Sequence, residues 1–362
     1  MIPLFKPYIA NQLPCLIEIL HSGQLAYGKY SHEFEERIKA YIGIDNFLCT
    51  NSFNTAFLIM LNALGLQSGD EVIASPMCCL ASTQPLATLG LKVVWADIDP
   101  FTGTLDPSDV KKKITSKTKA IIHNHFCGFV GHVKEIKHIA EKYGLLLIDD
   151  VSEAFGSEFE GKKAGNWDSD ATVYSFQTVR LPNSIDGGGI SFKSSEHFQK
   201  AIILRDYGIN RAIFRDDIGE ISKECDITVS AYGALPNDPN CYIGLTALKA
   251  IENLLKQQSD NAKSWTSRTS LLNILPLKIV PNSKPNYWIY GGLVENKRDF
   301  ILHMRNNEGF YASSVHLPNN NYSLFGYKKA LIGVEEFYSK FVALPCGWWL
   351  TQEDIYGRTE GI

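Results

Sequence analysis

The sequence lacks the long apolar run that a membrane-spanning helix requires. Its 362 residues contain no stretch of about 18 uninterrupted apolar residues. The first ten residues, MIPLFKPYIA, hold two prolines and no signal-peptide apolar core. We therefore expect a cytoplasmic protein that does not enter a membrane.

The sequence also lacks an excess of positive charge and any regular spacing of cysteine. Lysine and arginine number 35 against 39 aspartates and glutamates, a net charge of −4, which argues against a nucleic-acid-binding surface. None of the eight cysteines forms a CxxC pair, so we expect neither a disulfide framework nor a metal site.

Short apolar runs alternate with segments of helical periodicity, and this alternation carries the fold prediction. The helical pattern is clearest over Val133–Tyr143, where Ile136, Ile139 and Ala140 recur on one face. The alternation predicts βαβ crossovers, and hence an α/β fold with a mostly parallel sheet flanked by helices. Ligands of such sheets bind beyond the carboxyl ends of the strands. The expected strands are Glu71–Ser75, Leu91–Ile98, Lys119–Phe126, Leu145–Val151, Ala171–Phe176 and Gly189–Phe192.

A long helix is expected after a proline-rich stretch, over Asn237–Lys256. It would lead out of a large domain made of residues 1–255. Beyond it the strand–helix alternation fades, and Pro, Asn and Trp cluster. Residues 256–362 are therefore expected to form a smaller C-terminal α+β domain.

Several motifs, spread in order along nearly the whole chain, match those of one enzyme family. They are Ile2-Pro3-Leu4 with Lys6-Pro7, Ser22-Gly23 with Glu33-Phe34-Glu35, Asp97-Ile98-Asp99 with Thr102, Ile148-Asp149-Asp150 with Ala154 and Gly156, Tyr174-Ser175-Phe176 with Asp186-Gly187-Gly188-Gly189, and Phe341–Pro345 with Leu350-Thr351. On these motifs the chain resembles the DegT/StrS family of nucleotide-sugar aminotransferases, which use pyridoxal phosphate (PLP). The resemblance implies the fold type I PLP-transferase architecture, a homodimer, and a nucleotide-linked sugar of cell-surface polysaccharide biosynthesis as the small-molecule partner.

The resemblance places four residues at the cofactor. Asp150, at the end of an apolar strand, would pair with the pyridinium nitrogen of PLP, and an aspartate that caps the following turn is the alternative. Ser175 and Thr55 would bond the cofactor phosphate, Thr55 from a helix N-terminus that favours anions. Ordinary helix capping is the alternative there. Asn54 stands where the family has glycine, which leaves less room for a phosphate to approach the backbone.

Arg180 departs from the family at the position of its Schiff-base lysine. Aligning Ser175-Phe176 and the triple glycine places Arg180 there. A guanidinium stays protonated and cannot form an aldimine with PLP. No lysine lies between Lys163 and Lys193, so a neighbour does not replace it. The resemblance therefore implies that any PLP is held without a covalent aldimine.

Other positions depart in the same direction. Leu80 stands where an aromatic ring stacks on the cofactor, and Glu153 stands where a Gln or His hydrogen-bonds the ring hydroxyl. A carboxylate at position 153 would face a phenolate-like oxygen of like charge. The stretch Tyr232–Leu235 lacks the Asn and Arg that the second subunit contributes in the family. Together with Arg180, these departures predict a rebuilt cofactor pocket.

Two histidines and two cysteines are further candidates. We expect His123 and His125, which alternate on one predicted strand, to point to opposite faces. His125 matches a family histidine near the cofactor edge and is a candidate acid/base group or sugar contact, with a hydrogen-bonded interior histidine as the alternative. Cys78 and Cys79 follow an expected strand near the cleft, but a nucleophilic thiolate needs a basic neighbour, and the sequence indicates none.

Three functions stay open at this point. The first is a sugar aminotransferase, or a mechanistic relative that holds PLP non-covalently. The second is a non-catalytic homologue that binds a nucleotide sugar or a partner. The third is a PLP-independent enzyme in which Arg180 clamps a phosphate or carboxylate, while Asp150, Glu153 and His125 act as acid/base groups.

Overall fold

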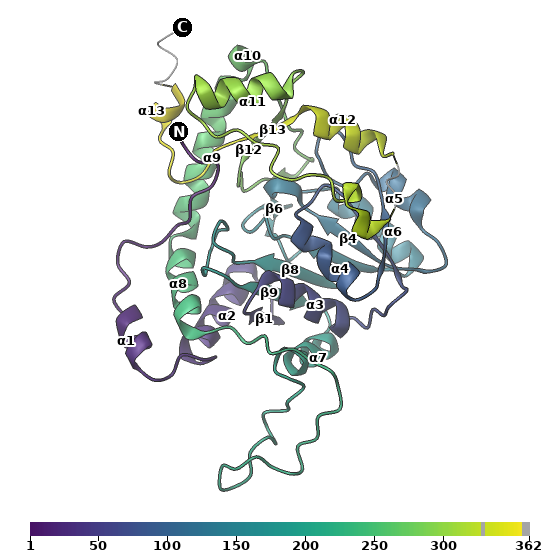
Figure 1. Cartoon of the computed structure of the whole chain (residues 1–362), viewed down its shortest axis with the longest axis vertical. Coiled ribbons are helices and arrows are strands. Elements are labelled where there is room, and N and C mark those ends of the chain that lie inside the picture. Colours follow the sequence, from purple (N-terminus) through teal and green to yellow (C-terminus); the bar gives the residue numbers. More distant parts are fainter. Residues whose placement is uncertain (327–329, 357–362) are drawn as a thin grey trace.

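A seven-stranded sheet forms the centre of the computed structural model, which describes residues 1–326 and 330–356 (Figure 1). Its order is β1-β9-β8-β5-β4-β2-β3, in which β2, β3, β4, β5 and β8 run parallel and β9 is antiparallel to both neighbours. The predicted mostly parallel sheet is confirmed. The strands are β1 Phe47–Thr50, β2 Glu71–Ala74, β3 Lys92–Trp95, β4 Thr118–Asn124, β5 Leu146–Asp150, β8 Ala171–Ser175 and β9 Gly188–Phe192.

Consecutive residues of the central strands serve opposite faces of the sheet. In β4, Ile121 packs with residues of α5 (Pro107–Lys113) and α6 (Val133–Tyr143). Its neighbour Ile122 packs on the other side with residues of α3 (Phe53–Ala63). Since both faces are covered, these strands have continuous apolar sequences. Helix α6 has the bounds predicted for it and ends at Gly144, whose left-handed backbone closes the helix.

The predicted helix Asn237–Lys256 is two helices, so that prediction is wrong in its length and continuity. Helix α8 runs from Asp238 to Lys249, and the side chain of Asn237 caps it by accepting from the backbone N–H of Asn240. Helix α9 begins at Ile251 and continues to Ser267. The break at Ala250 carries neither glycine nor proline, so the sequence gives no local signal of it.

The C-terminal residues have a hydrophobic core of their own, in which Trp265, Tyr290 and Phe310 are buried. Helix α9 runs across residue 255, where we divided the chain, and the two-domain division stays a prediction. The N-terminus joins this part through a bridge between Ile2 and Phe310. Two small sheets accompany it, with strands β10 Leu275–Pro276, β12 Tyr290–Leu293 and β13 Phe341–Leu344, and β6 Glu158–Phe159, β7 Lys162–Lys163 and β11 Ser283–Lys284.

The segment between α7 and α8 extends away from the body of the molecule (Figure 1). Within the described ranges, no helix is both long enough and apolar enough to cross a membrane. The remaining helices are α1 Leu16–His21, α2 Lys29–Ile42, α4 Gln84–Thr88, α7 Ser195–Arg205, α10 Thr269–Leu272, α11 Lys297–Asn306, α12 Ile332–Lys340 and α13 Gln352–Tyr356. Short 3-10 turns occur at Leu80–Ser82, Phe126–Gly128, Asn319–Asn321 and Ser323–Phe325.

Candidate functional site

Buried polar side chains gather where three neighbouring strands end. Asn124, at the end of β4, pairs in register with Asp150 at the end of β5, and Ser175 ends the adjacent strand β8. Asp150 accepts from the side-chain amide of Asn124 at 2.9 Å and from the backbone N–H of Ser152 at 3.0 Å. Asp150 is fully buried and Ser175 is 5% exposed. Both predicted cofactor residues therefore lie at the ligand edge of the sheet.

Arg180 lies in the connection between β8 and β9, and its guanidinium is held from two sides. Nη2 donates to Glu153 Oε1 at 3.3 Å. Cζ lies 4.1 Å from the ring centroid of Trp288, a cation–π contact. Only 7% of the Arg180 side chain is exposed. The structure thus brings together two residues that the sequence singled out separately, Arg180 and Glu153, in one buried ion pair.

Both carboxylate oxygens of Glu153 accept hydrogen bonds. Its Oε1 also accepts from His316 Nε2 at 2.8 Å, and its Oε2 accepts from the backbone N–H of Cys127 at 2.8 Å. Burial alone would raise the pKa of this carboxyl, but the charges of His316 and Arg180 outweigh burial and lower the pKa to about 2. Glu153 is therefore a carboxylate at neutral pH.

Two members of this cluster, Trp288 and His316, escaped the sequence analysis. His316 lies 163 residues from Glu153, and no local motif marks it or Trp288 as a site residue. Both come from the C-terminal part of the chain, so only the fold brings them to the edge of the large sheet.

The expected phosphate residues lie at the start of α3. Ser52 caps the helix by accepting from the backbone N–H of Thr55 at 3.2 Å, and Thr55 Oγ1 donates to Asn51 Oδ1 at 2.7 Å. Asn54 is exposed, and Leu80 is 39% exposed. The capping alternative accounts for the hydrogen bonds seen at Thr55.

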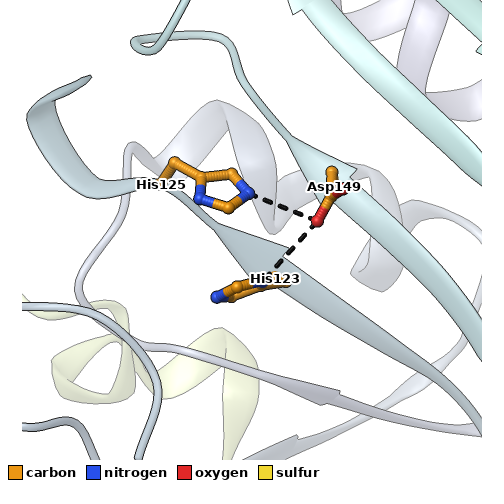
Figure 2. Close-up of side chains that lie close together, drawn as sticks. All are labelled: His123, His125 and Asp149. Carbon is orange, nitrogen blue, oxygen red and sulfur yellow. Dashed lines mark hydrogen bonds and ion pairs between the residues drawn. The ribbon is translucent and has the colours of Figure 1, made fainter. Parts of the chain in front are cut away.

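His123 and His125 lie on the same face, so the expectation of opposite faces is wrong. Side chains two positions apart on a strand point the same way, and both rings approach Asp149 Oδ1 (Figure 2), at 3.5 Å from His123 Nδ1 and 3.2 Å from His125 Nε2. Asp149 precedes Asp150 and points to the other face of β5. His125 consequently contacts Asp149 and Trp167, not the Arg180–Glu153 pair.

These three side chains offer a metal ion three ligand atoms within 4.8 Å of one another. The hydrogen bonds, however, fix the tautomer of His125. The backbone N–H of Gly131 donates to His125 Nδ1 at 3.1 Å, so the ring proton is on Nε2, which donates to Asp149. A metal-binding histidine presents a lone pair at one nitrogen and donates from the other. The arrangement of His125 is therefore that of a structural hydrogen bond.

Electrostatics agree with a structural role for this cluster. Burial lowers the pKa of His123 to about 4. Burial would raise the pKa of Asp149, but the close approach of His123 and the hydrogen bond from His125 hold it well below its usual range. A neutral His123 thus lies beside an ionised Asp149.

The two adjacent cysteines are not activated as nucleophiles. Cys78 is buried and accepts from the side-chain amide of Asn319 at 3.3 Å. Burial raises the pKa of the Cys78 thiol, and it also raises that of Cys79. Both are therefore thiols at neutral pH, and the nucleophilic interpretation receives no support.

The residues present do not fit a covalently linked PLP. Arg180, expected at the position of the family's lysine, is a guanidinium already paired with Glu153, and Glu153, expected to face the ring hydroxyl, is ionised. Asp150, expected to pair with the pyridinium nitrogen, is fully buried, with both oxygens hydrogen-bonded within the chain.

Comparison with known proteins covers nearly the whole chain. The profile of the DegT/DnrJ/EryC1/StrS aminotransferase family matches residues 9–357. The chain is 26% identical to the UDP-4-amino-4,6-dideoxy-N-acetyl-beta-L-altrosamine transaminase of Helicobacter pylori, over 94% of this chain and 93% of that protein. It is 24% identical to the spore coat polysaccharide biosynthesis protein SpsC of Bacillus subtilis, over 100% and 96%. The sugar aminotransferase CalS13 from Micromonospora echinospora superposes with a TM-score of 0.92 at 24% identity, over 98% and 97%.

Proposed function

The chain belongs to the DegT/DnrJ/EryC1/StrS aminotransferase family and has its fold type I architecture, and on that premise we propose that it is a non-catalytic member. In this proposal it binds a nucleotide-linked sugar at the carboxyl edge of the sheet and transfers no amino group to it. We place the protein in the cytoplasm on the basis of the sequence features described above. Its proposed biological process is cell-surface polysaccharide biosynthesis.

The observation that carries the proposal is the buried contact between Arg180 and Glu153. Transamination needs a neutral amine at the lysine position, both to attack the PLP aldehyde and to move a proton. A guanidinium paired with an ionised carboxylate at 3.3 Å does neither. Because the pair is buried and further bonded to His316, it belongs to the packed structure of this edge.

The two other candidate functions have less support. A PLP-independent enzyme would need Asp150, Glu153 and His125 to converge on one substrate. His125 instead faces Asp149 on the opposite side of β5 and is fully buried. A working aminotransferase that uses non-covalent PLP would need another base, and Glu153, with its pKa lowered to about 2, is too weak a base for that step.

Support for a nucleotide-linked sugar comes from the relatives. The Helicobacter pylori protein is named as a transaminase of a UDP-linked sugar, and the Bacillus subtilis protein as one of polysaccharide biosynthesis. Identities of 24 to 26% over nearly full length favour a related ligand class without specifying the sugar. We therefore take UDP-linked sugars as the first ligands to test.

We extend the proposal to a homodimer. The segment between α7 and α8 extends from the body of the molecule (Figure 1). It carries exposed apolar side chains, among them Ile213, Ile218 and Ile221, which are 48%, 79% and 61% exposed. Exposed apolar patches of this kind mark interaction surfaces. Light scattering on the purified protein is expected to give the mass of a dimer, and Ile218→Asp with Ile221→Asp to shift it toward a monomer. A native protein that is monomeric at all concentrations contradicts this part.

The central test uses PLP itself. Purified protein is incubated with PLP, its visible spectrum is recorded, and the sample is reduced with borohydride and mapped by peptide mass spectrometry. No adduct is expected in residues 175–189, a stretch without lysine, while the Helicobacter pylori transaminase serves as the positive control. Peptide mapping matters because burial lowers the pKa of Lys297 to about 8, which leaves a fraction of free amine that reacts with aldehydes away from the site.

Two results would contradict the proposal. One is amino transfer to a nucleotide-linked keto sugar by the purified protein in the presence of PLP. The other is failure of any UDP-, GDP- or dTDP-linked sugar to bind in calorimetric titrations. The expected outcome is saturable binding of one nucleotide class, with the same affinity in the presence and absence of PLP.

A further inference from the structure

Arg180 has more hydrogen-bond donors than the chain uses. Nη2 donates to Glu153, but Nε and Nη1 have no hydrogen-bond partner among the described residues. With 7% of the side chain exposed, bulk water does not satisfy these donors either. Buried polar groups in proteins are almost always paired, because an unpaired one loses its hydrogen bonds to water, and the loss is larger when the group is charged. Two free donors on one guanidinium leave Arg180 able to bind an acceptor from outside the chain.

The acids near Arg180 are already committed to other donors. Glu153 accepts three hydrogen bonds through its two oxygens. Asp150, the other buried acid at the ends of the parallel strands, is hydrogen-bonded through both oxygens. An acceptor for Nη1 would come from outside this set, and a group that matches a guanidinium in charge is an anion.

Trp288 holds the guanidinium in a fixed orientation. Its ring stacks on Phe5, with ring centroids 4.3 Å apart and planes 15° from parallel. Arg180 Cζ lies 4.1 Å from the Trp288 centroid, so the indole contacts both Phe5 and Arg180. The indole N–H donates to the backbone carbonyl of Val179 at 2.9 Å. A side chain fixed in this way loses little entropy when it binds an anion.

We propose that Arg180 binds an oxyanion of the nucleotide-linked sugar through Nη1, one of its two free donors. This inference rests on the proposed function and gives the lysine position of the family a new role, recognition of charge. A carboxylate on the sugar and a phosphate of the nucleotide share the required chemistry, because arginine recognises both. The two sources are separated by experiment.

The experiment compares UDP-glucuronate with UDP-glucose, which differ in one carboxylate. Both are titrated calorimetrically into the native protein and into Arg180→Gln. Arg268→Gln is the matched control, because Arg268 is another buried arginine that pairs with a glutamate, Glu308, and lies near a tryptophan ring, Trp265, in the C-terminal core. Circular dichroism and thermal melting establish that both variants fold.

If Arg180 binds a sugar carboxylate, the native protein binds UDP-glucuronate about 10- to 100-fold more tightly than UDP-glucose, and Arg180→Gln removes that preference. If Arg180 binds a phosphate, Arg180→Gln lowers the affinity for both compounds by a similar factor. Arg268→Gln is expected to bind both as the native protein does. A folded Arg180→Gln protein that binds both compounds with native affinity overturns the inference.

A second measurement keeps this inference separate from the proposed function. Free glucuronate and inorganic phosphate are titrated while tryptophan fluorescence is recorded, with Trp288→Phe identifying the contribution of Trp288. An anion at Arg180 changes the surroundings of the indole on which the guanidinium lies, so a saturable change is expected in the native protein and in Arg268→Gln, but not in Arg180→Gln. If nucleotide sugars do not bind but this signal is present, the proposed function fails and the anion site stands. If neither the titrations nor the fluorescence depend on Arg180, the anion site is wrong.

Discussion

Glu153 and His316 lie 163 residues apart in the sequence, and Oε1 of one meets Nε2 of the other at 2.8 Å. This contact joins a C-terminal segment to the ligand edge of the large sheet. With Arg180 on the same oxygen, it makes Glu153 the centre of a buried charged cluster. In this cluster one buried carboxylate lies between a guanidinium and an imidazole.

Removing the carboxylate of Glu153 is expected to destabilise the protein strongly. In Glu153→Ala the Arg180 charge stays buried without its partner, and breaking such a pair costs about 3–5 kcal/mol of unfolding free energy. Urea denaturation measures the loss. The control is Asp260→Ala, which removes a surface partner of Lys256 and is expected to cost less than about 1 kcal/mol. Equal effects of the two substitutions contradict the buried ion pair.

The same carboxylate predicts how stability depends on pH. The pKa of Glu153 falls from 4.5 to about 2 on folding, so its contribution is fully present above pH 4.5 and is lost as the pH falls toward 2. The size of this contribution is on the order of 3 kcal/mol. Urea denaturation between pH 2 and 7 gives the unfolding free energy of the native protein and of Glu153→Gln at each pH. The difference between the two free energies measures the contribution of the carboxylate. A difference that does not change over this range contradicts the pKa assignment.

The fold could be predicted from the sequence where the signal is local. Apolar runs located six of the seven strands of the central sheet to within a few residues but missed β1, and the periodicity over Val133–Tyr143 gave helix α6 its bounds. The break at Ala250 could not be predicted, because neither glycine nor proline marks it. His123 and His125 were assigned to opposite faces against the period of two that strands impose.

The site was predictable only in part, for a different reason. The order of the motifs aligned Arg180 and Glu153 with functional positions of the family. Their contact, however, depends on the loops after β5 and β8 lying side by side. Trp288 and His316 belong to a distant part of the sequence and have no motif of their own. Tertiary packing, which a single sequence does not display, decides which side chains complete the cluster.

Restoring the lysine is expected not to restore the covalent cofactor link. In Arg180→Lys the ammonium would face a carboxylate whose pKa is lowered to about 2, and an adjacent carboxylate favours the protonated, non-nucleophilic amine. The visible spectrum with PLP should show no aldimine band, and borohydride reduction should leave position 180 unmodified. The double variant Arg180→Lys with Glu153→Gln removes the carboxylate and tests this reason. Aldimine formation in the single variant contradicts it.

The His123–His125–Asp149 cluster predicts unequal effects of one substitution at two neighbouring positions. Neither ring nitrogen of His123 has a hydrogen-bond partner among the described residues, so His123→Leu is expected to change the unfolding free energy by less than about 1 kcal/mol. His125→Leu strips a donor from Asp149 and an acceptor from the backbone N–H of Gly131, which costs about 2–4 kcal/mol. Urea denaturation of the two variants gives both numbers. Zinc titration of the native protein is expected to leave its melting temperature unchanged, because the proton on His125 Nε2 occupies the position a metal would need. Equal costs for the two variants, or a zinc-induced stabilisation that His125→Leu abolishes, would show that the tautomer assigned to His125 is wrong.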